Sequence, residues 1–451
     1  MVKVHEFVDQ GLGHSSYLID IGDGTAAVID PPRFPIDLES LARRRQLRIR
    51  WTFDTHSHAD YVTGSPALAA RTGATFVAPS ASALETRHHA VSDGERVELC
   101  DGISMRVLAT PGHTPDHHAY VLTDSGRDIA LFSGGSLMVG TVGRTDLCGP
   151  ALAEPLAHKM FTSLRRFTDL AEDVEVFPTH GAGSFCSGQG AAAHTSTIAI
   201  ERRTNALFMI TNEETFVAQL LEGFGTFPAY FSRLPELNRL GPSHYDTIPR
   251  LKPLDVDMVV REIGDGARIV DARPFQAFAA GHVPGSLSNA LRPASASFLG
   301  WLVDPEQPLI FVLDPDQDRE TVVRQCLDVG LELIVGELDG GIAPWIAAGL
   351  PVTRIPIVDI EHLTQNMVDV RQANEYDAAH IPGAINIELA SIAAAQLPEG
   401  AFTLMCGHGE RAMTAASLIA VDGQAMARVS VFDGGPDTWS DATNNALEIA
   451  G

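Results

Sequence analysis

Histidine and aspartate side chains gather in the run HSHAD at residues 56–60, directly after the apolar run RIRWTF at residues 48–53. In an extended segment His56 and His58 project to the same side, so the end of a strand can aim both at one point. Two further histidines also follow strand-like runs, in Pro-Gly-His and Pro-Thr-His. Imidazoles and carboxylates are the usual protein ligands of zinc and iron(II). These motifs predict a metal site with five candidate ligands: His56, His58, Asp60, His113 and His180.

Cys406 is the second candidate for chemistry, because it ends the apolar, strand-like run FTLMC (402–406) and precedes the loop residues GHGER (407–411). A helical pattern follows, so loop N–H groups and the helix N-terminus would converge on the sulfur and stabilise an anionic sulfur there. The two loop glycines let the backbone curl around that point. We predict Cys406 as the nucleophile with Arg411 beside it, and the alternative is a buried cysteine that only packs. The predicted substrate-binding residues are Gly407, His408, Gly409 and Glu410.

Two stretches of the C-terminal half are near copies of each other, residues 270–290 and 368–388. A second pair, LDGGIAPW (338–345) and FDGGPDTW (432–439), closes each copy. The residues of the first copy that recur 98 positions later are Asp271, Arg273, His282, Pro284 and Gly285. A repeat of this length is the size of a small domain. Because short apolar runs alternate with helical patterns, we predict two homologous α/β domains with parallel sheets, at 253–354 and 355–451.

The first 240 residues show a different pattern, with several strand-like runs separated by helical segments. This pattern predicts an α/β or α+β domain over residues 1–240. The segment at 240–253 contains three prolines and no periodicity, so we expect the linker there. The candidate metal ligands then lie just past strands, where active-site loops of layered α/β proteins collect.

The composition limits the classes of function. The chain has 451 residues, more than the roughly 250–300 at which a single core stops growing, so two or three domains are expected. Its net charge of -25 repels phosphate backbones and anionic bilayers, which argues against nucleic acid and membrane partners. Five widely spaced cysteines argue against a disulfide framework and fit a reducing cytoplasm. We see no export signal and no apolar run near the roughly 18 residues of a membrane span.

Three motifs of the first domain resemble the persulfide dioxygenase branch of the metallo-β-lactamase fold: GHT (112–114), LFSGGSLMVGTVGRTDL (131–147) and PTHGAGSFC (178–186). The resemblance implies an αββα sandwich and a mononuclear iron(II) that oxidises the terminal sulfur of a persulfide to sulfite. On this chain the two histidine ligands of that iron fall on His56 and His113. Arg144 would contact an anionic persulfide carrier of the glutathione or coenzyme A type, or form a surface ion pair.

Two residues depart from the pattern of that family. Gly135 stands where the family has the aspartate ligand, and Tyr61 stands where its loop has a further histidine. The remaining expected site is the three-histidine face of His56, His58 and His113, which suits Zn(II) and could hold Fe(II). Asp60 and His180 are the replacement ligands. A first domain without metal, kept for structure or docking, is the alternative.

The Cys406 loop resembles the active loop of rhodanese sulfurtransferases, and DVR (369–371), AHIPGAIN (379–386) and DGGPDTW (433–439) match that family. Six residues run from Cys406 through Arg411, one fewer than in phosphate-cleaving relatives, and the shorter loop suits a sulfane sulfur. In the preceding domain Asp314 occupies the cysteine position and Arg319 matches Arg411. We therefore predict an inactive rhodanese-like copy there.

The order of the three domains resembles bacterial fusions of a persulfide dioxygenase with a sulfurtransferase. It implies oxidation of a low-molecular-weight persulfide to sulfite, and transfer of sulfane sulfur through Cys406 to or from thiosulfate and sulfite. Two alternatives stay open: a sulfurtransferase driven by Cys406 alone, and a zinc hydrolase of a thioester or similar bond. The thiol carrier, the direction of sulfur transfer and the oligomeric state, a homo-oligomer included, also stay open.

Overall fold

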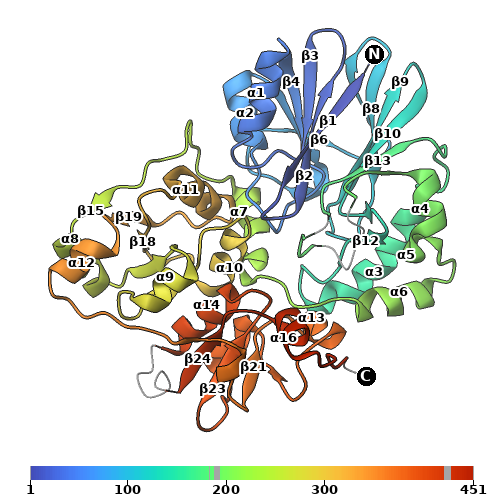
Figure 1. Ribbon diagram of the computed structural model, residues 1–451. Helices are drawn as coiled ribbons and strands as arrows, with labels where there is room; N and C mark the ends of the chain where they lie inside the picture. The colour runs from blue at the N-terminus through green and yellow to red at the C-terminus, as the bar shows by residue number, and fades with distance from the viewer. Residues whose placement is uncertain (1, 182, 187–192, 421–427, 450–451) are drawn as a thin grey trace. The chain divides into compact units, whose positions relative to one another are not determined.

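Figure 1 presents the computed structural model, which describes residues 2–181, 183–186, 193–420 and 428–449. The chain divides into two units, Met1–Ile248 with Leu327–Gly330, and Pro249–Cys326 with Leu331–Gly451. The boundary at 248–249 lies inside the segment expected as the linker. The histidine motifs belong to the first unit, and Cys406 belongs to the second.

Two six-stranded sheets form the first unit. Apolar residues such as Ala130, Leu131 and Phe132 of β10 are buried within them. The first sheet, in spatial order, consists of β1 (Lys3–Asp9), β2 (His14–Asp20), β3 (Thr25–Ile29), β4 (Arg48–Phe53), β5 (Thr75–Pro79) and β6 (His89–Val91). The second sheet consists of β14 (Ser196–Thr197), β13 (Glu175–Pro178), β10 (Arg127–Gly134), β9 (His118–Asp124), β8 (Ile103–Ala109) and β7 (Arg96–Cys100). A small ribbon pairs β11 (Leu137–Met138) with β12 (Thr141–Val142).

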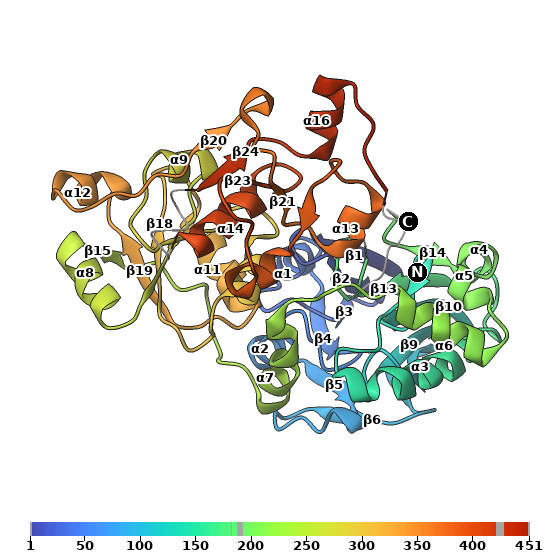
Figure 2. The same cartoon turned by 90° about the horizontal axis from the view of Figure 1, so that it is seen from below.

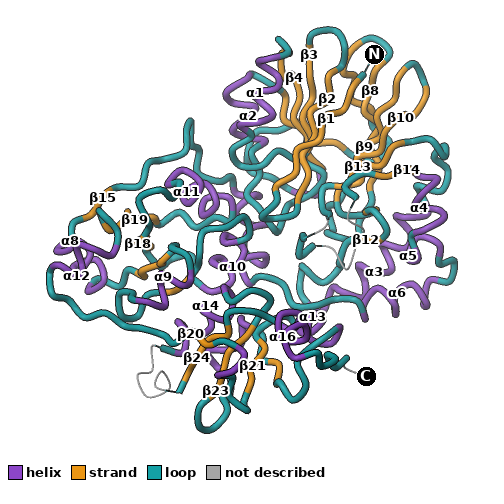
Figure 3. Tube along the Cα trace, viewed as in Figure 1, coloured by secondary structure: helices purple, strands orange, loops and turns teal. Residues whose placement is uncertain are grey.

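Helices cover the outer faces of both sheets, while aromatic side chains fill the space between the sheets. Phe53 and Tyr120 come from opposite sheets, and their rings lie 5.1 Å apart. Leu38 of α1 packs on the first sheet, and Met160 of α3 packs on the second. Figure 3 shows these helices in purple on either side of the orange strands. The predicted αββα sandwich is confirmed.

The helices of this unit are α1 (Ile36–Arg44), α2 (Ser65–Thr72), α3 (Pro150–Arg165), α4 (Ile198–Thr204), α5 (Ala206–Met209), α6 (Glu213–Glu222) and α7 (Leu234–Leu240), with the 3₁₀ turns η1 (Ser80–Ser82) and η2 (Ala229–Ser232).

Two five-stranded parallel sheets of the same topology form the second unit, as the repeat predicts; Figure 2 shows part of each. The first runs β15 (Pro253–Leu254), β19 (Ile334–Leu338), β18 (Leu309–Val312), β16 (Arg268–Asp271) and β17 (Leu287–Ser288). The second runs β20 (Ile357–Val358), β24 (Val429–Phe432), β23 (Phe402–Met405), β21 (Met367–Asp369) and β22 (Ile385–Asn386). The helices are α8 (Val256–Gly264), α9 (Phe275–Ala280), α10 (Ser295–Leu302), α11 (Arg319–Asp328), α12 (Ile342–Ala347), α13 (Ala373–Ala378), α14 (Glu410–Ile419) and α16 (Pro436–Thr443), with the turns η3 (Ile360–His362) and η4 (Leu389–Ala394). None of the helices in the described segments has the length and apolar character that a membrane crossing needs.

The residues shared by the two repeats hold each domain together. Arg273 donates to the buried carboxylate of Asp271 at 2.6 Å, and the equivalent pair of the second copy, 98 positions on, does so at 2.7 Å. His282 stacks on Phe278 with ring centroids 3.7 Å apart, and the second copy repeats this contact at 3.8 Å. The residues that recur in the two repeats therefore form structural contacts, and the catalytic residues must lie outside this shared pattern.

Candidate metal centre and cysteine loop

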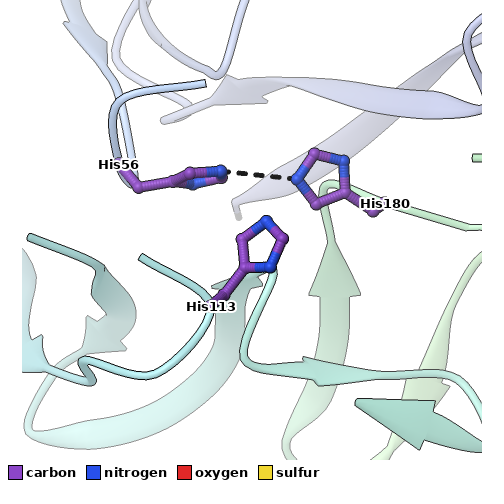
Figure 4. A group of neighbouring side chains, drawn as sticks. All are labelled: His56, His113 and His180. Atoms are coloured by element: carbon purple, nitrogen blue, oxygen red, sulfur yellow. Dashed lines mark hydrogen bonds between the residues drawn. The ribbon is translucent and has the colours of Figure 1, made fainter. Parts of the chain in front are cut away.

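Three histidines meet at one end of the αββα sandwich. His56 follows β4, His113 follows β8 and His180 follows β13, so strand ends of both sheets deliver them. Their candidate ligand atoms all lie within 4.8 Å of one another. The Nε2 atoms of His56 and His180 are 3.4 Å apart, and Figure 4 shows the three rings turned toward a common point.

In each of these rings Nδ1 faces a nearby oxygen atom, which leaves Nε2 for the centre. His113 donates from Nδ1 to the carbonyl oxygen of Arg144 at 2.8 Å. His56 Nδ1 lies 2.8 Å from the Thr55 hydroxyl oxygen, and His180 Nδ1 lies 3.2 Å from a carboxylate oxygen of Asp60. Within the described residues the buried His113 Nε2 has no hydrogen-bond partner. Metal-binding histidines usually have their second nitrogen oriented in this way, so these side chains fit a metal ion.

Burial lowers the pKa of two imidazoles of the centre, those of His56 and His113, whereas neighbouring histidines lower the pKa of the Asp60 carboxyl. Burial lowers the pKa of His113 to about 3, and burial together with the neighbouring histidines lowers the pKa of His56 well below its usual value. Burial opposes the charge on Asp60, but His180 and His58 nevertheless hold the pKa of that carboxyl below its usual value. Neutral imidazole is the form that binds metal, so this electrostatic environment is compatible with ligation.

His58 lies beside this centre and turns toward a different partner. Its Nε2 is 3.2 Å from the Asp30 carboxylate and 3.0 Å from the Tyr61 hydroxyl. Tyr61 is fully buried and stacks between His58 and His14, with centroid distances of 4.4 and 4.1 Å. The geometry therefore groups His180 with His56 and His113, whereas the sequence favoured His58 as the third ligand of that set. His58 instead lies within ligand distance of Asp60 and His180, in a second group of possible ligands.

Sequence reasoning missed Asp30, which organises this region. Its carboxylate accepts hydrogen bonds from the backbone N–H and hydroxyl of Thr55 at 2.7 and 2.8 Å, and another from the hydroxyl of Thr179. It also accepts from His58. Its position at the end of the strand-like run GTAAVID, just before two prolines, was the available signal.

Gly135 gives a physical reason for the missing carboxylate. A Cβ at this position would lie 2.2 Å from Cδ2 of His113, so the ring of His113 fills the space that a side chain would need. The backbone N–H of Gly135 donates to Nε2 of His117 at 2.9 Å. His117, which precedes β9, and His118, which begins it, are both buried.

Restoring the aspartate is therefore expected to fail. Gly135→Asp would push a buried carboxylate against His113 and should lower the free energy of unfolding by at least about 2 kcal/mol without raising metal affinity. Denaturant unfolding and metal titration check this, with Gly223→Asp as the control because a Cβ there meets only ordinary contacts. Tighter metal binding by Gly135→Asp would contradict this account of the site.

The side chain of Arg144 is buried and joins three neighbouring segments by hydrogen bonds. It donates to both oxygens of Asp146 at 2.7 and 2.8 Å and to the carbonyl oxygens of Phe185 and Gly225. Its guanidinium also lies 4.5 Å from the ring centroid of Phe227. Of the two roles suggested by the sequence, the structure shows an ion pair, with Asp146, and it is largely buried. These contacts favour a role in placing the Arg144 carbonyl that orients His113.

Arg144→Lys tests that role, because lysine cannot reproduce the bidentate contact. We expect the affinity for metal to fall about 10- to 100-fold, the usual cost of losing a group that orients a ligand. Metal titration of the apoprotein measures this, and Arg127→Lys, at an exposed pair with Asp173, is the matched control. Equal metal affinity in both variants would show that Arg144 does not position the centre.

The Cys406 loop has the geometry expected of a sulfur-binding loop. Cys406 directly follows β23 and is buried, and the backbone N–H of Gly409 donates to its Sγ at 3.1 Å. Gly409 has a φ of 95°, a left-handed conformation that glycine adopts without strain. Gly435 approaches from the closing loop, where a Cβ would lie 2.4 Å from the carbonyl oxygen of Gly407. The helix α14 then begins at Glu410, while His408 is exposed.

Arg411 is already paired. Its two terminal nitrogens donate to the carboxylate of Glu375 at 2.6 and 2.8 Å. Although burial opposes the charge, the hydrogen bonds and charge of Glu375 raise the pKa of Arg411. The guanidinium that sequence matching assigns to catalysis therefore has an internal counter-charge.

The corresponding loop of the preceding domain is closed by its own side chains. Arg319 donates to the carbonyl oxygens of Asp314 and Gln317 at 2.7 and 2.6 Å. The side-chain oxygen of Gln317 in turn accepts from the backbone N–H of Asp314 at 2.8 Å. Lacking a thiol and filled by these contacts, the loop offers no visible cradle for a sulfur anion, which agrees with the predicted inactive copy.

Fold and sites together define a class: a metallo-β-lactamase-type domain followed by two rhodanese-type domains. Comparison with known families agrees, since the metallo-beta-lactamase superfamily matches residues 9–180 and the rhodanese-like domain matches residues 255–348 and 359–442. The chain belongs to the metallo-beta-lactamase superfamily and carries two rhodanese-like domains after that domain.

Among its relatives is the hydroxyacylglutathione hydrolase of Prochlorococcus marinus (strain MIT 9211), which is 30% identical over 43% of this chain and 85% of that protein. A crystal structure of a metallo-beta-lactamase from Staphylococcus aureus subsp. aureus COL is 27% identical, covering 75% of this chain and 98% of that one with a TM-score of 0.64. The crystal structure of ETHE1 from Myxococcus xanthus is 30% identical, covering 52% of this chain and 98% of that one with a TM-score of 0.45.

Proposed function

We propose that the protein is an enzyme of sulfur metabolism that transfers sulfane sulfur through Cys406 and oxidises a small thiol persulfide at its three-histidine centre. The observation that carries the proposal is the position of the Cys406 sulfur at the start of α14, where it accepts the N–H of Gly409. Backbone donors at a helix N-terminus favour an anionic sulfur, which is the reactive form of cysteine.

Sulfur transfer at this loop needs no cofactor. The Cys406 thiolate attacks the outer sulfur of thiosulfate, the S–S bond of thiosulfate breaks, and sulfite leaves with the bonding electron pair. The product is a persulfide on Cys406. An acceptor thiolate, sulfite or cyanide then attacks the outer sulfur of this persulfide and removes it, and the Cys406 thiolate is regenerated. The N–H of Gly409 steadies the negative charge on the Cys406 sulfur during both steps.

Oxidation at the histidine centre follows the balance RSSH + O₂ + H₂O → RSH + SO₃²⁻ + 2H⁺. His56, His113 and His180 would hold the metal, and iron(II) there would supply the redox chemistry of this reaction. The chain contributes a buried site whose ligands are fixed by the Arg144 carbonyl, Thr55 and Asp60. Small persulfides of the glutathione or coenzyme A type are the proposed substrates, and the cytoplasm is the proposed location.

A zinc hydrolase is the second candidate. Three histidines with an open position suit zinc and its activated water, and several of the relatives are named hydroxyacylglutathione hydrolases. A sulfurtransferase whose first domain binds no metal is the third candidate, and it is weakened by the convergent, oriented histidines.

Persulfide formation on Cys406 tests the proposal directly. Incubation with thiosulfate should add one sulfur atom to the chain, and peptide mapping should locate it on Cys406. Unchanged mass at saturating thiosulfate, or sulfur on another cysteine, would overturn the assignment of this loop.

A further inference from the structure

The silent rhodanese-like domain contributes to the Cys406 site, because both domains of the second unit share one core. Phe275 of the silent domain packs on the loop so closely that a Cβ at Gly409 would lie 2.6 Å from its ring. The backbone N–H of Ser288 donates to the hydroxyl of Ser417 on α14 at 3.0 Å. Phe275 also belongs to the same buried cluster as Cys406. The surroundings of the reactive sulfur are therefore fixed by two domains.

The site needs a cation that is free to bind substrate. Thiosulfate is a dianion, and the net charge of -25 on the chain opposes its approach. Arg411 is the cation expected from sequence, but both of its terminal nitrogens are engaged by Glu375. A neutralised arginine attracts an anion much less than a free one, since the carboxylate cancels its field.

Arg292 of the silent domain provides such a cation. Arg292 lies in the segment that follows β17, and its backbone is held in place. The carbonyl oxygen of Arg292 accepts from Gln325 Nε2 at 3.0 Å and from the Ser295 hydroxyl at 2.8 Å. Its guanidinium carbon lies 4.8 Å from the ring centroid of Phe298. In the described part of the chain, no hydrogen bond or ion pair involves that guanidinium. It is thus preorganised by stacking and retains its donors.

The electrostatics relate Arg292 to the reactive loop. Burial lowers the pKa of Arg292, and the nearby charge of Arg411 lowers it further. Glu410 and Cys406 act in the opposite direction and favour the charged guanidinium. Packing places Arg292 in the same region, because Phe298, on which its guanidinium stacks, packs against the buried cluster that contains Cys406.

We propose that Arg292 is the residue that binds the anionic group of the sulfur donor at the Cys406 site, so that the silent domain supplies the substrate-binding charge. The inference rests on the proposed sulfur transfer and names the class of donor: small sulfur oxyanions such as thiosulfate. Guanidinium binds oxyanions through two parallel N–H donors, and it would hold the sulfonate oxygens while Cys406 attacks the outer sulfur. The S–S bond of thiosulfate breaks, and sulfite carries away the electron pair.

Steady-state transfer from thiosulfate to cyanide tests the inference. Arg292→Met should raise the KM for thiosulfate about 10- to 100-fold with a smaller change in kcat, the range expected for loss of a charge-assisted contact. The dependence of kcat/KM on salt should weaken, and Arg292→Lys should restore part of both effects. Arg261→Met, at an exposed position on α8, is the matched control. If Arg292→Met does not fold, Arg292→Gln replaces it.

A second readout does not depend on turnover. Alkylation of Cys406 by anionic iodoacetate, relative to neutral iodoacetamide, should fall in Arg292→Met and stay unchanged in Arg261→Met. An unchanged KM, salt dependence and alkylation ratio in Arg292→Met, with Cys406→Ser inactive, would overturn the assignment of Arg292 alone. Transfer that survives in Cys406→Ser would instead overturn the proposed function.

Discussion

Cys406→Ser reduces sulfur transfer from thiosulfate to cyanide by at least about 1000-fold, because a serine hydroxyl does not form a nucleophilic anion near neutral pH. The substitution is nearly isosteric, and the donor from Gly409 still has an acceptor at that position. We therefore expect the loop between β23 and α14 to keep its conformation. Thiocyanate formation at saturating thiosulfate measures the loss.

Cys148→Ser is the matched control for this experiment, since Cys148 is exposed and lies in the first domain. It should retain full transfer activity. Cys406→Ser should also bind as much metal as the unmodified chain, because the histidine centre lies in the other unit. Transfer above about one part in a hundred in Cys406→Ser would place the sulfur carrier elsewhere in the chain.

His180→Gln is expected to have the second large effect, a loss of metal affinity of more than about 100-fold. Groups that merely orient a ligand already change affinity about 10- to 100-fold, so removing a ligand should cost more. His180 supplies one of three converging Nε2 atoms, and its Nδ1 faces Asp60. Competition with a chromophoric chelator measures the affinity of each variant.

His58→Gln is the informative partner of that variant. The glutamine side chain can still donate a hydrogen bond to Asp30, in place of His58, so the contacts around Tyr61 should persist. Metal affinity should therefore change little. The two variants separate the ligand set favoured by sequence from the set favoured by geometry. Loss of metal in His58→Gln with retention in His180→Gln would show that the third ligand is His58.

Local patterns were sufficient to predict much of the fold. The apolar run at 48–53 became β4 with the same limits, and the run at 402–406 became β23, which ends one residue earlier, at Met405. The repeat predicted two parallel sheets, and both have the same strand order. These features depend on residues close in sequence, or on a duplicated pattern, and a single sequence displays both.

The sites depended on packing between distant residues, which sequence did not reveal. The grouping of His180 with His56 and His113, and the contact of His58 with Asp30, both join residues far apart in the sequence. The ion pair of Arg411 with Glu375 joins residues 36 positions apart, and no sequence motif predicts it. Gly135 was recognised as a missing ligand, yet only the structure shows that His113 occupies the space.

The acid–base state of the metal centre has a structural cause as well. The buried carboxylate of Asp30 accepts from His58, and that of Asp60 lies 3.2 Å from Nδ1 of His180, so each places a negative charge beside a buried imidazole. Such orientation by carboxylates fixes the tautomer of a ligating imidazole. The arrangement explains how a centre without its own aspartate ligand still has carboxylates close by.

Oxygen uptake by the anaerobically purified protein, with glutathione persulfide as substrate and metal content measured on the same sample, tests the central claim most directly. We expect bound iron and persulfide-dependent oxygen consumption, with sulfite formed in equal amount and with His180→Gln inactive. Bound zinc without oxygen uptake would contradict the proposed oxidation and favour a hydrolase. A metal-free protein that still transfers sulfur through Cys406 would reduce the function to the sulfurtransferase alone.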